Sequence, residues 1–213
     1  MNNKIDHFAI GANNLEQGIS FLQEKLGVEI PRGGKHPAMS THNCLAQSGN
    51  SSFIEVISID PEAPDPGRVR WFTLDDPNTQ ARVTEAPKAL CWVVNTDDLD
   101  AVIAASPVDL GEVLELSRGD LSWKLTVPKD GSLVEGGLLP AFIEWSREPH
   151  PSSGMQDIGV ELKTIRLTHP EPEKLTAMLA SLSLEHLVEV VSGKEAGLSF
   201  DLQNPDGEIV EIN

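Results

Sequence analysis

Two residues on separate predicted strands, His7 and Glu55, carry side chains that could move a proton or hold a metal ion. Period-two alternation along 4–10 and along 52–59 places each of them on the face opposite its apolar neighbours. If those apolar neighbours face one core, His7 and Glu55 share the other face of the sheet. An imidazole nitrogen and a carboxylate suit Fe(II), Mn, Ni or Zn, although two ligands do not make a site. The alternative is a hydrogen-bonded His–Glu pair inside a half-buried sheet.

The elements that must position His7 are predicted within residues 4–30 as a strand, a helix and a second strand. Asn14 is a good N-cap, and Gly27 stands where a left-handed C-cap is expected. The second strand is predicted at Val28–Ile30 and ends at Pro31, and residues 33–40 form a loop. Two more strands, at 41–47 and 52–59, complete the unit. The helix has an apolar stripe formed by Leu15, Ile19, Leu22 and Leu26.

The order strand, helix and three strands is predicted three times along the chain. The modules are 1–88, which includes a long and partly ordered connection, 89–159, which ends in a linker, and 160–213, which is shorter. Aligning the helix starts brings His7, Cys91 and Thr164 to one position of the first strand. Glu55, Glu144 and Glu211 then coincide in the last strand, at separations of 48, 53 and 47 residues.

The repeat makes Glu144 the best third metal ligand, and a glutamate left unbound to metal could move a proton instead. Cys91 could bind as a thiolate, but a buried structural thiol is the commoner fate of a cysteine. Thr164 is a poor ligand, so Glu211 is interpreted as structural.

Further polar and aromatic residues could contact a substrate. Either His36 or His42 could bind a metal or donate to a substrate oxygen, with a surface histidine as the alternative for each, and Asn43 could donate to a carbonyl. Arg118, before a glycine turn, could hold a carboxylate with two hydrogen bonds, or pair with Asp120 in solvent. Strands of the second module carry Trp92, Trp123 and Trp145, which are predicted to belong to the core or to an aromatic cavity wall.

Composition limits the class of protein. The 213 residues carry a formal charge of −17, which argues against nucleic acid and against anionic membranes as partners. No apolar run is long enough to span a bilayer, no signal region opens the chain, and two cysteines make no disulfide framework. These features predict a soluble cytoplasmic protein with a small-molecule ligand.

The residues Ile5–Ile10, Lys25–Gly27 and Phe53–Ile57 resemble the vicinal oxygen chelate superfamily, which includes glyoxalase I, extradiol dioxygenases and bleomycin-resistance proteins. The segments 33–37, 41–43, 139–145 and 150–152 are similar to its glyoxalase-like-domain branch. The resemblance implies an α+β fold in which repeated βαβββ modules form a curled, mixed-sheet half-barrel around a cavity. Modules one and two would form the cavity, with the third packed beside it or pairing subunits in a homodimer.

The resemblance also implies a divalent metal at His7 and Glu55, acting as a Lewis acid on neighbouring substrate oxygens. A metal-dependent lyase or isomerase is then the first hypothesis, with Glu144 as ligand or base. Cys91 stands where a second histidine would be offered, which disfavours the four-ligand glyoxalase I arrangement and ring cleavage by a dioxygenase. The alternative is a metal-free binding or resistance protein that sequesters an aromatic or carboxylated ligand.

Overall fold

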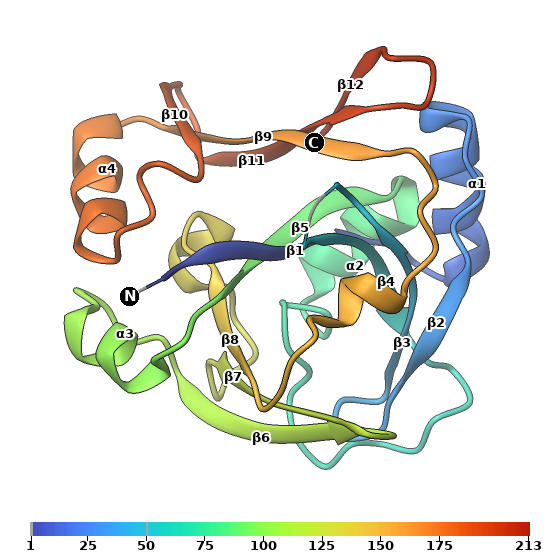
Figure 1. Ribbon diagram of the computed structural model, residues 1–213, viewed down its shortest axis with the longest axis horizontal. Coiled ribbons are helices and arrows are strands. Elements are labelled where there is room, and N and C mark those ends of the chain that lie inside the picture. Colours follow the sequence, from blue (N-terminus) through green and yellow to red (C-terminus); the bar gives the residue numbers. More distant parts are fainter. Residues whose placement is uncertain (1, 50) are drawn as a thin grey trace.

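The computed structural model describes residues 2–49 and 51–213 and confirms the α+β class. The first two modules share one mixed eight-stranded sheet with the strand order β2-β3-β4-β1-β5-β8-β7-β6. The sheet curls into a half-barrel, with β1 and β5 joined antiparallel at its centre (Figure 1). Within each of these modules the last strand pairs parallel with the first.

The first module begins with β1 and ends with β4. Its helix is capped at both ends as the sequence predicts, since the Asn14 side chain accepts from Gln17 N and Gly27 has φ 72°. Gly18 lets this helix pack closely, because a Cβ there would lie 2.3 Å from Val56 Cγ1 of the sheet. The elements are β1 (Lys4–Gly11), α1 (Leu15–Leu26), β2 (Arg32–His36), β3 (Thr41–Gln47) and β4 (Phe53–Ile59).

The prediction for the second strand of this module was wrong. Residues 28–30 are not a strand, and β2 instead contains both Gly33 and Gly34. Glycine inside a strand marks a close approach of other groups. A Cβ on Gly33 would lie 2.4 Å from Asn43 Oδ1, and one on Gly34 would lie 3.0 Å from Arg118 Nη1. The two glycines therefore allow the side chains of Asn43 and Arg118 to approach β2 closely.

The connection to the second module contains a helix that the sequence did not predict. Asp76 caps this helix by accepting from Asn78 N and Thr79 N, and Pro77 takes its first position. The elements from here to the linker are α2 (Pro77–Glu85), β5 (Lys88–Asn95), α3 (Leu99–Ala105), β6 (Glu112–Arg118), β7 (Leu121–Val127) and β8 (Ala141–Trp145).

The third module repeats the element order but not the strand pairing. Its elements are β9 (Glu161–His169), α4 (Pro172–Ser181), β10 (Glu189–Ser192), β11 (Gly197–Gln203) and β12 (Ile209–Ile212). They form a separate sheet in the order β10-β9-β11-β12. Here the first strand pairs with the second and third, whereas in the other modules it pairs with the fourth. The repeat-based equivalence of Thr164 and Glu211 with His7 and Glu55 therefore does not extend to the structure.

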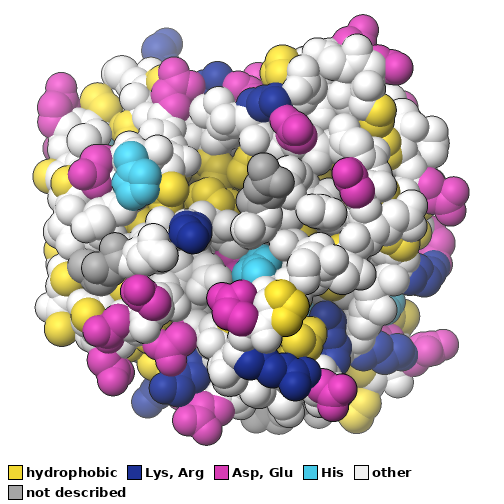
Figure 2. Space-filling model, viewed as in Figure 1, with side chains coloured by type: hydrophobic (Ala, Val, Ile, Leu, Met, Phe, Trp, Pro, Cys, Tyr) yellow, Lys and Arg dark blue, Asp and Glu magenta, His cyan; other side chains and the backbone are white. Residues whose placement is uncertain are grey.

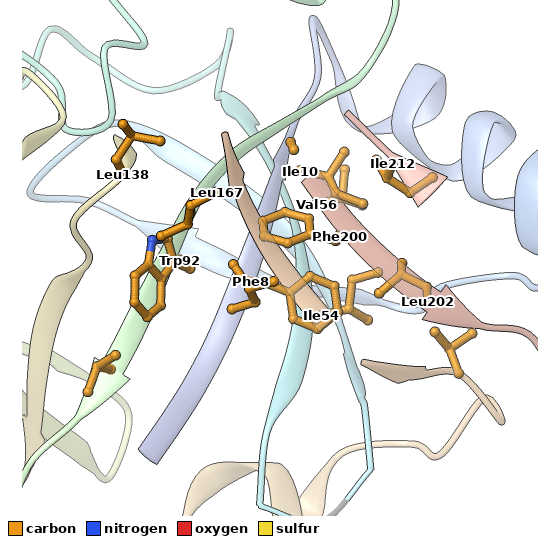
Figure 3. Packing of buried hydrophobic residues seen from close by; sticks show 14 of the residues in the cluster. Phe8, Ile10, Ile54, Val56, Trp92, Leu138, Leu167, Phe200, Leu202 and Ile212 are labelled. Atoms are coloured by element: carbon orange, nitrogen blue, oxygen red, sulfur yellow. The ribbon is translucent and has the colours of Figure 1, made fainter. Parts of the chain in front are cut away.

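The two faces of the larger sheet bury different cores. The outer face packs against the helices and against the four-stranded sheet, which lies over β1 and β5 in Figure 1. Phe8 and Ile54 of the larger sheet meet Phe200 and Leu202 of the smaller one (Figure 3). The ring centroids of Phe8 and Phe200 are 5.0 Å apart. The inner face lines the cavity.

On the face drawn in Figure 2, acidic side chains are interspersed with Lys and Arg. This distribution agrees with the net charge of −17. Among the described helices, none has the length and apolar character that a bilayer crossing requires.

Candidate active site

A cavity of about 50 Å³ lies on the concave face of the eight-stranded sheet. Both modules of that sheet contribute to it, as does the connection between them. The lining residues are His7, His36, Asn43, Phe53, Glu55, Trp71, Phe72, Arg118, Trp123, Leu125, Ile143 and Trp145.

A β-bulge in β1 places two consecutive polar side chains toward this cavity. Ile5 pairs with Val94 and His7 with Val93, so Asp6 is the extra residue of the bulge. Ile5 packs with the outer core, whereas Asp6 contacts cavity-side groups, and the normal alternation resumes after His7. Bulges commonly re-aim side chains beside active sites. The sequence pattern predicts strict alternation and misses Asp6 for this reason.

Asp6 is fully buried and accepts hydrogen bonds from three rings. Its Oδ1 lies 2.6 Å from His7 Nδ1, and its Oδ2 lies 2.7 Å from Trp145 Nε1 and 2.9 Å from His150 Nε2. Because an ionised carboxylate only accepts, each facing ring nitrogen carries the proton. His150 belongs to the linker, and its Nδ1 lies 2.8 Å from Ser152 Oγ.

Burial and hydrogen bonding oppose each other at this carboxylate. Burial alone would raise the pKa of Asp6, but the hydrogen bonds from His150 and His7 prevail and lower that pKa to about 2. Burial would likewise lower the pKa of His7, but its hydrogen bond to Asp6 and the negative charges of Asp6 and Glu55 together raise that pKa above its ordinary value. Asp6 is therefore ionised at neutral pH, and His7 keeps its proton to a higher pH than a free histidine does.

Glu55 faces the free nitrogen of His7. The Glu55 Oε2 to His7 Nε2 distance is 3.6 Å. Asn43 Nδ2 donates to the other carboxylate oxygen, Oε1, at 2.6 Å. Gly34 N donates to Asn43 Oδ1 at 2.8 Å, which fixes the orientation of the amide. One oxygen of Glu55 is thus held in place and the other remains available beside His7.

His36 and Arg118 occupy the side of the cavity formed by the two edge strands. Asn43 Nδ2 lies 3.3 Å and Arg118 Nη1 3.5 Å from His36 Nε2, and His36 Nδ1 lies 3.0 Å from Thr41 Oγ1. Burial, with a smaller contribution from the Arg118 charge, lowers the pKa of His36 to about 4. His36 is therefore neutral, with Nε2 accepting. Among the described carboxylates, none forms an ion pair with Arg118.

The structure places Glu144 away from His7 and Glu55. Its Oε2 accepts from Leu99 N at 2.9 Å, at the start of α3, and its Oε1 lies 3.5 Å from Lys124 Nζ. Ile143 of the same strand lines the cavity instead. The register explains this, because β5 pairs Val93 with Ala141 where β1 pairs Ala9 with Glu55, so Ala141 holds the position that corresponds to Glu55. Glu144, three residues further on, takes the opposite face of the strand.

Two other predicted site residues also lie outside the cavity. His42 points to the other face of β3, where its Nδ1 is 3.9 Å from Asp60 Oδ1. Trp92 is buried in the outer core beside the third module. Asn43, Arg118, Trp123 and Trp145 line the cavity as the sequence predicts for a binding surface.

The remaining lining residues come from segments that the sequence did not assign to a site. Phe53 stacks on His7 with ring centroids 4.5 Å apart and an interplanar angle of 16°. Trp71 and Phe72 come from the connection, whose apolar stretch at 71–74 was the available signal. The buried Trp71 Nε1 has no hydrogen-bond partner among the described residues.

The side chains of the cavity do not meet the requirements of a divalent metal. His7 Nε2 and Glu55 Oε2 are near enough to share an ion, but no group of three His, Cys, Asp or Glu side chains among residues 2–49 and 51–213 is placed to hold one. Burial raises the pKa of the Cys91 thiol well above its usual range, so Cys91 does not offer a thiolate. His36 Nε2 lines the same cavity but already faces Asn43 Nδ2 at 3.3 Å and Arg118 Nη1 at 3.5 Å, and these two groups are donors rather than ligands. These side chains do not complete a protein metal centre.

Comparisons with known proteins agree with this architecture. A crystal structure of a hypothetical protein from Staphylococcus aureus matches with a TM-score of 0.65 at 16% identity, covering 100% of this chain and 99% of that one. Methylmalonyl-CoA epimerase from Mycobacterium tuberculosis matches with a TM-score of 0.43 at 17% identity, covering 70% of this chain and 91% of that one. A Streptomyces coelicolor methylmalonyl-CoA epimerase in complex with 2-nitronate-propionyl-CoA matches with a TM-score of 0.41 at 17% identity, covering 68% and 98%. None of the proteins with curated descriptions matches the chain.

Family membership rests on the sequence of the first two modules and part of the third. The family model described as a glyoxalase-like domain matches residues 5–183, which is most of the chain. The chain therefore belongs to the glyoxalase-like domain family.

Proposed function

We propose that this glyoxalase-like protein is an isomerase or lyase that moves a proton on a small, oxygenated metabolite in the cytoplasm. One observation carries the proposal: inside the cavity, Glu55 Oε2 lies 3.6 Å from His7 Nε2, while buried Asp6 holds the other nitrogen of that ring. A fixed carboxylate next to a fixed imidazole is the arrangement that general acid–base catalysis uses.

The two groups take opposite roles. Glu55 Oε2 accepts a proton from a carbon next to a carbonyl or carboxylate group of the substrate. Negative charge then develops on the substrate oxygen, and protonated His7 donates its Nε2–H to that oxygen. The raised pKa of His7, which persists against burial because of Asp6 and Glu55, favours this protonated form. Return of the proton to a neighbouring atom completes an isomerisation, and loss of a leaving group completes a lyase reaction.

The guanidinium of Arg118 supplies a positive charge that can bind the substrate. Arg118 is half-buried at the cavity wall and unpaired with the described carboxylates, so its guanidinium is available for a substrate carboxylate. Two parallel N–H donors match the two oxygens of that group. The unpartnered Trp71 Nε1 offers one further donor in the same cavity. The substrate is therefore proposed to be an oxygenated carboxylate.

The size of the cavity restricts what reacts. The cavity is narrow, at about 50 Å³, and we propose that a small reacting end of the substrate enters it. Proton transfer is assigned to Glu55 and His7 themselves, because among the described residues no three His, Cys, Asp or Glu side chains are grouped to hold a metal ion.

A second candidate function is a metal-free binding protein. The aromatic lining of the cavity favours it, because flat rings with a single cation suit capture of an aromatic carboxylate. The rings are those of Phe53, Trp71, Phe72, Trp123 and Trp145.

Hydrogen–deuterium exchange into candidate substrates distinguishes the two functions. Small 2-oxo and 2-hydroxy carboxylates are incubated with the protein in D2O, and deuterium at the carbon next to the oxygenated group is followed by NMR. The wild-type protein is expected to exchange one of them, and Glu55→Gln to do so at least about 100-fold more slowly. Binding without exchange supports the binding protein. Equal exchange by both proteins would overturn the role of Glu55.

A further inference from the structure

We infer that Asp6 is a positioning residue that fixes the proton of His7 on Nδ1, and that Trp145 and His150 impose this by occupying the other oxygen of Asp6. The inference deepens the proposed function and rests on it for its catalytic meaning. Its geometry, however, can be tested without any substrate.

The first step is the asymmetry of the Asp6 carboxylate. One oxygen, Oδ1, meets only His7 Nδ1, at 2.6 Å. The other, Oδ2, meets two donors, Trp145 Nε1 at 2.7 Å and His150 Nε2 at 2.9 Å. The group is fully buried, so water does not compete for these positions.

The second step concerns whether each of these partners must donate a hydrogen bond to Asp6. An indole Nε1 is a donor only, whereas an imidazole nitrogen can donate or accept. Trp145 therefore requires an acceptor at the Oδ2 position under all conditions. His150 requires an acceptor there as well, because its other nitrogen, Nδ1, accepts from Ser152 N at 3.3 Å, which leaves the proton of the neutral ring on Nε2.

The third step links this to the cavity. With Asp6 ionised, Nδ1 of His7 is the protonated nitrogen and Nε2, which faces Glu55, is the nitrogen that gains and loses a proton. The ring is also held flat against Phe53. Trp145, in the last strand of the second module, and His150, in the linker, thus determine which nitrogen of His7 can act on a substrate.

An Asp6→Asn substitution converts this reasoning into a measurement. The asparagine oxygen must face Trp145, so its NH2 group must face His7 Nδ1. That nitrogen then has to accept, and the proton of neutral His7 moves to Nε2. In the double variant Asp6→Asn/Trp145→Phe, the Nε2–H group of His150 still requires the asparagine oxygen, because its Nδ1 accepts from Ser152 N, so the Nε2–H form of His7 persists.

The tautomer is read from long-range 1H–15N NMR of the histidine rings at alkaline pH, where every histidine is neutral. The expected series is Nδ1–H in the wild type, Nε2–H in Asp6→Asn, and Nε2–H again in the double variant, where His150 alone holds the amide oxygen. The control is His186→Gln, an exposed histidine that serves to assign signals and should leave the His7 resonances in place. Thermal unfolding of each variant checks that it is folded.

Several outcomes would overturn the inference. One is a wild-type spectrum with the proton on Nε2, which needs no variant to fold. Another is an Asp6→Asn protein that keeps Nδ1–H, and a third is a double variant that returns to Nδ1–H, which would show that His150 does not hold the amide. Failure of the proposed function has a separate signature, since absence of substrate exchange would leave the tautomer series unchanged.

Discussion

Glu55 lies diagonally across from His7 on the neighbouring parallel strand, because the register of β1 and β4 pairs His7 with Phe53 and Ala9 with Glu55. The distance between His7 Nε2 and Glu55 Oε2 is 3.6 Å. Both side chains stand on strands buried along most of their length. Their separation is therefore set by backbone pairing rather than by a loop, which suits groups that must keep a fixed distance.

Replacing Glu55 by Gln is expected to lower the pKa of His7. The negative charge of Glu55 is one of the groups that raise that pKa, after the hydrogen bond and charge of Asp6, and glutamine removes the charge with little change in shape. NMR titration of the His7 ring measures the shift. Glu144→Gln is the matched control, since its carboxylate lies at the start of α3. Equal pKa values in the wild type and Glu55→Gln would contradict the described contact.

Replacing Arg118 by Gln is expected to weaken binding of a carboxylate ligand by about 10- to 100-fold, the usual worth of hydrogen bonds to a charged group. Isothermal titration with the ligand found by exchange measures the change. Arg147→Gln, which removes an exposed arginine of the segment after β8, is the control. A similar loss in both variants would mean that Arg118 acts only through general charge.

The stability of the protein is expected to fall as the pH drops through the range in which His36 resists protonation. Burial lowers the pKa of His36 to about 4, below the ordinary value of 6.5. Between these two pH values the unfolded chain binds more protons at His36 than the folded chain does. The stability that neutral His36 contributes is therefore complete above pH 6.5 and is lost as the pH falls to about 4. The raised pKa of His7 acts oppositely, giving stability that is present below pH 6.5 and lost as the pH rises through the raised value.

Chemical denaturation of the wild type and His36→Gln at about pH 7 and about pH 4.5 isolates the first effect. The variant should lose less free energy of unfolding between the two conditions than the wild type does. His186→Gln, at an exposed position, should behave as the wild type. An identical pH dependence in His36→Gln would show that His36 protonates freely in the folded protein.

The two glycines of β2 are expected to differ in their tolerance of alanine. At Gly33 the new Cβ would lie 2.4 Å from Asn43 Oδ1 and 2.9 Å from Leu45 Cγ, groups that are buried and held. Such overpacking costs about 1–3 kcal/mol of the free energy of unfolding. At Gly34 the nearest atom is the end of the flexible Arg118 side chain, 3.0 Å away, which can move.

Urea unfolding of Gly33→Ala and Gly34→Ala compares the two sites directly. Gly154→Ala is the reference, because no atom lies within 4 Å of its added Cβ. A Gly34→Ala protein that is as unstable as Gly33→Ala would mean that Arg118 is rigidly fixed against β2.

Purified protein is expected to bind Fe, Mn, Ni or Zn weakly and without dependence on His7, because the described side chains supply only two of the ligands that a site needs. Elemental analysis after incubation with each ion, beside a His7→Ala variant, measures this. One equivalent of metal in the wild type that is lost in His7→Ala would instead establish a metal centre and require a different catalytic scheme.

Local sequence signals predict those features of the first module that depend on short-range interactions of the backbone. The caps of α1 at Asn14 and Gly27 are confirmed, as is the strand that carries Glu55. These features depend on a few adjacent residues. The helix at Pro77–Glu85 had a comparable signal in Asp76 and Pro77, but the surrounding Pro and Asp residues favoured an irregular segment.

The candidate site was predicted less completely because it depends on which face each residue takes. A single bulge at Asp6 turns two adjacent side chains to the cavity side of the sheet, and no local pattern of residue types marks it. The register of β8 against β5 turns Glu144 outward and Ile143 toward the cavity. His150 joins the site from a linker, through contacts with residues 144 positions away in the sequence. Such pairings are set by tertiary structure, which a period-two pattern does not encode.

The contact of the third module with the outer face of β1 and β4 also bears on how a ligand reaches the cavity. Phe8 and Ile54 are sealed beneath Phe200 and Leu202, so the floor that carries His7 and Glu55 can open only with much of the protein (Figure 3). The rest of the lining is different, since it includes the connection around Trp71 and the β6–β7 hairpin that carries Arg118. We expect a ligand to enter by movement of these segments, with the spacing of the acid and the base preserved while it does so.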